Sequence, residues 1–96
     1  MHAVMRAYSG KGAKELLDLI EKNKKDIEKL IKGIKGFVSY YAVRTEDGSF
    51  TVSVFKDKAG ADESVRVARE WVKKNAADTG VAPPKVSEGT VALHFK

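Results

Sequence analysis

The pattern of hydrophobic and polar residues predicts four strands in this chain. His2–Tyr8 and Phe37–Thr45 are rich in aromatic and β-branched residues, and Thr90–Phe95 has a similar composition at the end of the chain. Phe50–Lys56 alternates strictly, as expected for a strand whose two faces have different surroundings. This alternation separates two sets of side chains: Phe50, Val52 and Val54 on one face, and Thr51, Ser53 and Phe55 on the other.

Helical spacing begins at Ala13. An apolar stripe follows from there, formed by Leu16, Ile20, Ile27, Leu30, Ile31 and Ile34. Asn23 and Lys24 interrupt the stripe, and Gly36 is the expected left-handed end of the helix. A second helix is predicted from about Gly60 to Ala77.

The order of elements predicts the fold. Asp47-Gly48 indicates a tight hairpin between the second and third strands, because both residues tolerate positive φ. The β-α-β-β-α-β order predicts an α+β, ferredoxin-like domain over residues 1–96, with a four-stranded antiparallel sheet in the spatial order 4-1-3-2 and two helices on one face. The other face would show apolar side chains to solvent, so we expect a homodimer closed sheet to sheet.

Composition narrows the class of protein. A chain of 96 residues with 43% hydrophobic and 32% charged residues is typical of one globular domain. No apolar run or leader-like segment suggests a membrane span or export, so we expect a cytoplasmic protein. The absence of cysteine excludes disulfides and thiolate metal sites. We expect no metal site and no cofactor.

The net charge of +5 comes largely from residues 11–35, which hold eight lysines and five acids. We interpret this segment as a solvated helix face with pairs such as Glu28–Lys32, because arginine, which phosphate recognition favours, is absent from it. Nucleic-acid binding is therefore not expected. Lys35–Tyr40 only superficially resembles an RNA-binding motif, and the turn at residues 9–12 lacks a phosphate-binding glycine pattern.

Three segments support a family resemblance: Lys35-Gly36-Phe37 before the second strand, Asp47-Gly48 at the hairpin, and Val54-Phe55-Lys56-Asp57 before an alanine-rich helix. With the overall layout, they resemble the dimeric α+β-barrel superfamily, and most closely its antibiotic-biosynthesis-monooxygenase-like group. The resemblance implies a homodimer with a ligand pocket between sheet and helices. Members include cofactor-independent monooxygenases, haem-degrading enzymes and proteins without known activity.

The chain departs from the family at residues that matter for chemistry. Phe55 stands where many members carry Trp at the end of the third strand. The haem-degrading branch places Trp and His on the second helix, where this chain has Ser64 and Lys74, and an Asn on the first strand, which has none here. Haem degradation is therefore not expected.

His94 is the candidate catalytic residue. We expect it on the fourth strand beside His2, where it could act as an acid–base group. The two histidines lack a third ligand on these strands, so a metal site is not expected.

Candidate ligand-binding residues come from four elements. Tyr40 and Tyr41 must face opposite sides of the sheet, and an arginine inside a barrel, Arg6 or Arg44, would need an acid or an anionic ligand. The full set is Arg6, Tyr40, Tyr41, Arg44, Phe55, Ser64 and Trp71. Aromatic walls and cations suit a small aromatic or anionic molecule.

These residues leave two interpretations of function open. The first is a cofactor-independent monooxygenase that binds a phenol, in line with the family resemblance. The alternative is a non-catalytic binding or assembly protein, because the family's functional side chains are missing. RNA binding is a distant third.

Overall fold

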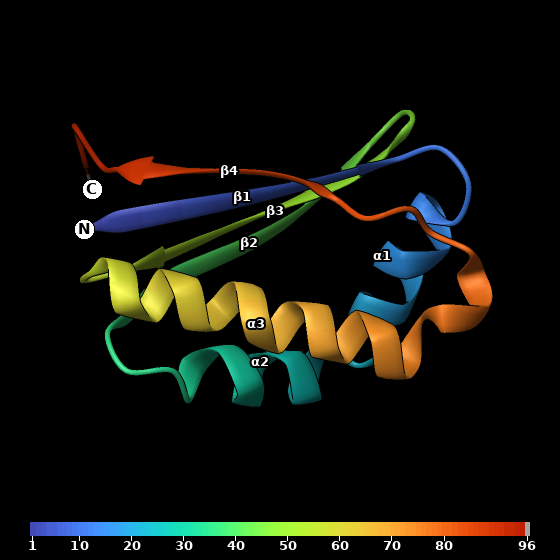
Figure 1. Ribbon diagram of the computed structural model, residues 1–96, viewed down its shortest axis with the longest axis horizontal. Coiled ribbons are helices and arrows are strands. Elements are labelled where there is room, and N and C mark those ends of the chain that lie inside the picture. The colour runs from blue at the N-terminus through green and yellow to red at the C-terminus, as the bar shows by residue number, and fades with distance from the viewer. Residues whose placement is uncertain (96) are drawn as a thin grey trace.

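The elements follow the predicted order, with the first helix divided in two. Their positions come from a computed structural model of the chain, which describes residues 1–95 (Figure 1). In chain order the elements are β1 (His2–Ser9), α1 (Ala13–Lys22), α2 (Lys24–Lys32), β2 (Phe37–Thr45), β3 (Gly48–Phe55), α3 (Lys58–Asn75), a short 3-10 helix (Ala77–Thr79) and β4 (Lys85–Thr90).

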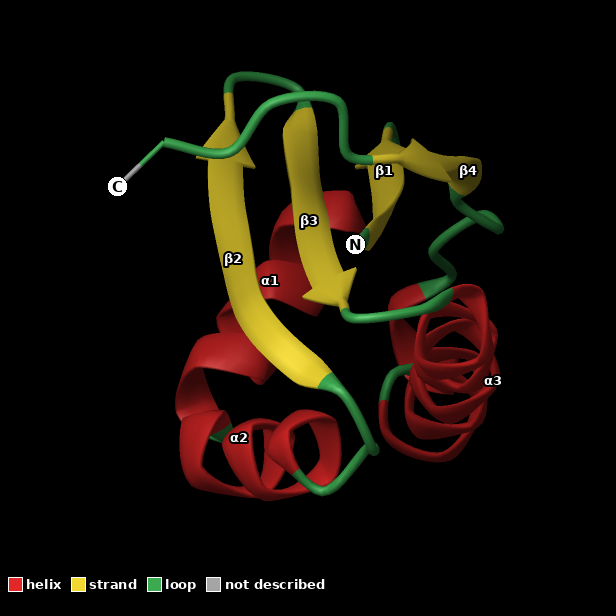
Figure 2. Ribbon diagram, turned by 90° about the vertical axis from the view of Figure 1, so that its left-hand side faces the viewer, coloured by secondary structure: helices red, strands yellow, loops and turns green. Residues whose placement is uncertain are grey.

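The strands form one antiparallel sheet in the order β2-β3-β1-β4, which confirms the predicted order and the ferredoxin-like class. His2 at the start of β1 lies opposite Phe55 on one side and Thr90 on the other. In Figure 2 the helices lie together on one side of this sheet. The opposite face, called here the open face, carries no helix.

Asn23 divides the predicted first helix into α1 and α2. Its side-chain amide donates to the carbonyl oxygen of Leu19 at 2.8 Å, and its own backbone N–H donates to the same oxygen at 3.0 Å. Asparagine favours such local bonds over a continuing helix, so the break follows from residue type. None of the helices within residues 1–95 is long and apolar enough to span a membrane.

Gly36 has the left-handed conformation expected of it, with φ of 86°. Its carbonyl oxygen accepts a 2.8 Å hydrogen bond from the backbone N–H of Lys56, which ties the start of β2 to the end of β3. Directly after this bond, Asp57 caps α3 by accepting from the N–H of Gly60 at 3.1 Å. The two turns therefore fix where α3 leaves the sheet.

The hairpin lies where it was expected, but for a different reason. Neither Asp47 nor Gly48 has positive φ, so the predicted cause is wrong. Glycine is required at position 48 because the backbone of β1 approaches it closely. A Cβ atom there would overlap the carbonyl oxygen of Tyr8. The glycine thus lets β1 and β3 pair to the end of the hairpin.

The fourth strand was misplaced. It spans Lys85–Thr90 rather than Thr90–Phe95, and all six of its residues are exposed. An exposed edge strand is held by backbone bonds to β1 and needs no hydrophobic pattern, so periodicity favoured the apolar segment that follows. That segment runs past the ends of the strands (Figures 1 and 2), with Leu93 76% and Phe95 86% exposed.

The predicted alternation of β3 is confirmed, and its more polar face is the one under the helices. Ser49, Thr51 and Ser53 are buried there, at 3% exposure or less. Phe50, Val52 and Val54 lie on the open face and are only half-buried. The usual segregation of apolar residues is therefore inverted from Ser49 to Val54, whereas Phe55 at the end of the strand is fully buried.

The core under the sheet consists of two apolar clusters. One gathers Val4, Ile27, Ile31, Ile34, Phe55 and Ala61; the other gathers Tyr8, Ala13, Leu16 and Ala76. Trp71 of α3 packs against both clusters. Polar residues of β1 and β3 lie between them, and these residues form the candidate site.

Candidate ligand pocket

Arg6 lies at the centre of the buried face of β1. The strand turns Val4, Arg6 and Tyr8 toward the helices, and the Arg6 side chain is only 5% exposed. Thr51 of β3 and Val86 of β4 lie opposite it in the two ladders. The register alone therefore places a guanidinium in the middle of the domain.

This guanidinium has no counter-charge among the described residues. Its Nε and Nη1 atoms are buried without a hydrogen-bond partner, and Arg6 takes part in no ion pair within residues 1–95. Two nearby hydroxyls, Oγ1 of Thr51 and Oγ of Ser53, are also buried and unpartnered. Buried polar groups without partners are costly, so their occurrence together points to a site for a polar ligand.

Arg6 lies between two adjoining cavities. The larger has a volume of about 360 Å³, which falls in the range of small-molecule pockets. It is lined by Arg6, Tyr8, Val65, Arg69, Val72, Lys73, Val81, Ala82, Pro83, Pro84 and Val86. The smaller has a volume of about 30 Å³ and also touches Arg6 and Tyr8, together with Tyr40, Thr51 and Trp71. We call the larger cavity the Arg6 pocket.

The Arg6 pocket is positively charged. Its lining contains Arg6, Arg69 and Lys73 but no aspartate or glutamate.

Tyr40 lies beside this pocket, and burial raises the pKa of its hydroxyl. The charge of Arg6 lowers this pKa because it favours the phenolate, and Tyr8 raises it. The site is therefore suited to an anion with an apolar body.

A second hollow lies on the outside of the helix layer. This groove between α2 and α3 has a volume of about 1090 Å³ and is broad and open. Residues of both charges line it, including Lys29, Lys74, Glu63 and Glu70, with Trp71 among them. Its mixed charge and shape select no ligand class, unlike the Arg6 pocket.

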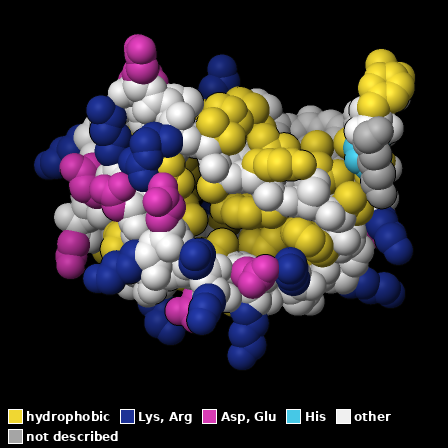
Figure 3. Space-filling view, turned by 180° about the vertical axis from the view of Figure 1, so that it is seen from behind, with side chains coloured by type: hydrophobic (Ala, Val, Ile, Leu, Met, Phe, Trp, Pro, Cys, Tyr) yellow, Lys and Arg dark blue, Asp and Glu magenta, His cyan; other side chains and the backbone are white. Residues whose placement is uncertain are grey.

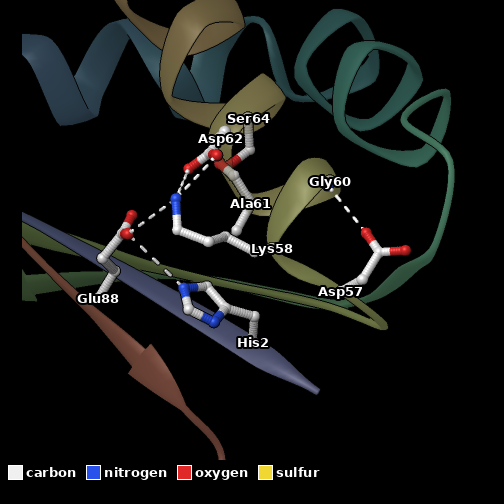
Figure 4. Close-up of polar contacts among 8 residues, drawn as sticks. All are labelled: His2, Asp57, Lys58, Gly60, Ala61, Asp62, Ser64 and Glu88. Atoms are coloured by element: carbon white, nitrogen blue, oxygen red, sulfur yellow. Dashed lines mark hydrogen bonds and ion pairs between the residues drawn. The ribbon is translucent and has the colours of Figure 1, made fainter.

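A second polar cluster lies where α3 begins (Figure 4). Lys58 pairs with Asp62 at 3.0 Å and with Glu88 of β4 at 3.7 Å, and Glu88 is 3.7 Å from Nε2 of His2. No group of three or more potential metal-ligating residues occurs within residues 1–95. We interpret the cluster as a polar link between β4 and α3.

Three of the predicted site residues meet around the two cavities. Arg6 lines both, whereas Tyr40 and Trp71 line the smaller one. Tyr8 and Thr51, which were not predicted, complete the group. Tyr8 and Thr51 could have been predicted from the alternation along the two strands. That alternation places Tyr8 on the same face as Arg6, and Thr51 on the same face as Phe55.

His94 lies elsewhere. It was expected on the fourth strand beside His2, but Thr90 occupies the position opposite His2 and β4 ends there. His94 falls in the exposed segment after β4 and lines none of the three hollows described above. The expected pairing of the two histidines is therefore wrong.

The other predicted ligand contacts also lie outside the Arg6 pocket. Tyr41 is on the open face and 61% exposed, and Phe55 is fully buried, edge to face with Phe37. Ser64 is fully buried and donates its hydroxyl to the carbonyl oxygen of Ala61 at 2.6 Å. Phe55 and Ser64 therefore pack inside the domain, whereas Tyr41 lies on the face away from the helices.

Arg44 meets acids rather than a ligand. It pairs with Asp18 at 3.0 Å and with Glu21 at 2.7 Å, both on α1. These bonds raise the pKa of Arg44 and hold β2 against α1. The expected pair between Glu28 and Lys32 is present at 2.8 Å.

No protein-family model matches the chain, and no curated protein sequence does either. Solved structures do match. A protein of unknown function from Nitrosomonas europaea has a TM-score of 0.69 at 17% identity, with 99% of this chain and 91% of that chain covered. A dimeric ferredoxin-like protein from an uncultured marine organism has a TM-score of 0.67 at 16% identity, covering 98% and 94%.

A third match is a monooxygenase of Streptomyces coelicolor in complex with the ligand Nanaomycin D. Its TM-score is 0.63 at 16% identity, with 99% of this chain and 89% of that chain covered. The chain has a ferredoxin-like fold, the description given for the marine-organism protein. The resemblance to the antibiotic-biosynthesis-monooxygenase-like group is thus confirmed at the level of the fold.

Proposed function

We propose that this protein binds a small aromatic anion between its sheet and α3, with Arg6 as the counter-charge. The observation that carries the proposal is the buried guanidinium, 5% exposed and unpaired at Nε and Nη1, in a pocket without carboxylates. An anionic group beside Arg6 would supply the missing hydrogen-bond acceptors. Apolar lining residues such as Val72, Val81 and Pro84 would contact the rest of the molecule.

Calorimetric titration of benzoate and of a panel of phenols into purified protein tests this proposal. Arg6→Met should weaken binding at least about tenfold, because charge-assisted bonds to an ionised group contribute roughly 1.5–3 kcal/mol. Arg44→Met is the matched control, since it removes an arginine that is already paired with Asp18 and Glu21. Equal affinities for wild type and Arg6→Met would overturn the proposal.

Oxygenation of the bound molecule is a second candidate function, favoured by the cation beside the cavity and by the likeness to the Streptomyces coelicolor monooxygenase. Arg6 would lower the pKa of a bound phenol, and the phenolate is the form that reduces oxygen. The overall reaction balances without a cofactor: a phenol with a free para C–H reacts with O2 to give a quinone and water, and each product receives one of the two atoms of O2.

Oxygen uptake with electron-rich phenols separates this function from binding alone. We expect uptake to fall in Arg6→Met and to persist in His94→Ala, because His94 lies outside the Arg6 pocket. Loss in His94→Ala with retention in Arg6→Met would contradict this assignment. Tight binding without turnover would leave the non-catalytic function, the alternative kept open by the sequence.

We further propose that the open face binds a second copy of the chain. Half-buried Phe50, Val52 and Val54 lie there beside exposed Tyr41 and Met5, whereas the buried face of β3 is rich in hydroxyls. An apolar face of this kind is stabilised when another apolar surface covers it. Figure 3, viewed from the β2 side, shows hydrophobic side chains gathered across the middle of the molecule. Two of the matching proteins are described as dimeric.

A further inference from the structure

The outer part of the Arg6 pocket carries two more cations. Val65, Arg69, Val72 and Lys73 lie at helical spacing on one face of α3, and all four line the pocket. Arg69 and Lys73 are exposed, whereas Arg6 is buried. The pocket therefore has a positive group at its buried end and a positive pair at its mouth.

Two other cations of α3 are neutralised by neighbours, whereas Lys74 on the outer groove forms no ion pair within residues 1–95. Lys58 pairs with Asp62 at 3.0 Å, and Arg66 pairs with Glu63 at 2.6 Å and with Glu70 at 2.8 Å. By contrast, Arg69 and Lys73 take part in none of the ion pairs formed within residues 1–95. Among the described residues, two of the three unpaired cations of this helix thus line the Arg6 pocket.

We propose that the ligand of the Arg6 pocket is an aromatic molecule with two acidic groups at opposite ends of its ring system. One group binds Arg6, the ring lies against Val72 and Pro84, and the second group lies at the mouth beside Arg69 and Lys73. The inference rests on the proposed binding function and adds the chemical class of the ligand. Two separated anionic groups match the two separated positive ends, which a single carboxylate cannot do.

Two probes test it: benzoate and benzene-1,4-dicarboxylate, titrated calorimetrically at low ionic strength. The dicarboxylate should bind roughly 2- to 30-fold more tightly than benzoate, because its second carboxylate can form up to two exposed charge pairs. The double variant Arg69→Gln/Lys73→Gln should abolish this difference, because it weakens binding of the dicarboxylate more than binding of benzoate. The control Arg66→Gln/Lys74→Gln makes the same charge change on residues that line the outer groove, and should preserve the difference.

The possible outcomes distinguish a failure of the two-acid ligand from a failure of the proposed binding function. If wild type binds both probes equally and Arg6→Met weakens both, the second acidic group is excluded and the proposed function stands. If Arg6→Met leaves both affinities unchanged, the proposed function fails and the inference fails with it. Failure of both probes to bind wild type would overturn both statements.

Discussion

Arg6 on β1 and Thr51 on β3 lie opposite each other in the sheet, both buried, with polar atoms that have no hydrogen-bond partner. Two adjacent residues left unpaired in this way destabilise the free protein. Such a pair is expected at a binding site, where a ligand supplies the missing partners. The cost to stability is therefore part of the function we propose.

Replacing Arg6 by methionine should stabilise the free protein while weakening ligand binding. An apolar side chain of similar length removes an unpaired buried charge, and replacements of buried ionic groups by apolar ones stabilise by roughly 1–4 kcal/mol. We expect the free energy of unfolding in urea to rise by about 1–2 kcal/mol. A fall in that free energy would show that the guanidinium is well satisfied in solution.

Tyr40 should titrate above its ordinary pKa of 10.0, because burial disfavours the phenolate. The folded chain then keeps a proton that the unfolded chain has lost, so this residue makes the free energy of unfolding decrease as the pH rises above about 10. The tyrosinate absorbance of wild type minus that of Tyr40→Phe isolates the titration. If the two proteins titrate alike in the alkaline range, the prediction is wrong.

The same titration reports on the charge of Arg6. Arg6 lowers the pKa of Tyr40, so a bound anion that neutralises Arg6 should raise this pKa further. Arg6→Met should produce the same upward shift without ligand. A downward shift in either experiment would contradict the proximity of the two groups.

Gly48→Ala should destabilise the chain, because the new methyl group would overlap the carbonyl oxygen of Tyr8. Forcing atoms into packed structure typically costs about 1–3 kcal/mol. Gly89→Ala on β4 is the control, because nothing lies within 4 Å of a Cβ atom there, and we expect a change within about 0.5 kcal/mol. Equal effects in urea unfolding would remove the close approach as the reason for Gly48.

Tyr41→Asp should weaken the proposed dimer without unfolding the subunit, because Tyr41 is 61% exposed on the open face. A buried unpaired charge in an interface typically costs several kcal/mol, so native mass spectrometry at micromolar protein should detect monomer. Leu30→Asp on α2, at a residue 41% exposed, is the matched control and should remain dimeric. A wild-type monomer, or a Tyr41→Asp dimer of wild-type affinity, would exclude the open face as the interface.

The fold was predictable because its main elements carry strong periodic signals. Phe37–Thr45 was predicted to the residue, and Asn23 was recognised as an interruption. The fourth strand was not predictable in this way, because an edge strand exposed at all six residues has no hydrophobic signal. The sequence also could not show which face of β3 is buried, since the rule that apolar residues point inward gives the opposite answer there.

The candidate site was predictable only in part. The reasoning that a buried arginine needs a counter-charge identified Arg6, but it applied equally to Arg44, which meets two acids of α1. Arg69 and Lys73 look like ordinary solvated residues of a charged helix. Only the tertiary arrangement shows that they face a pocket without carboxylates.

Val81, which forms part of the pocket wall, belongs to a segment that lies directly against Gly12 before α1. A Cβ atom on Gly12 would be 2.6 Å from the carbonyl oxygen of Thr79 and 2.7 Å from the amide nitrogen of Val81. Because of this contact, the segment that contains Val81 cannot move toward α1 to enlarge the pocket. A wider ring system could therefore enter only if α3 moved away from the sheet. The largest ligand that can bind is set by how far α3 can be displaced.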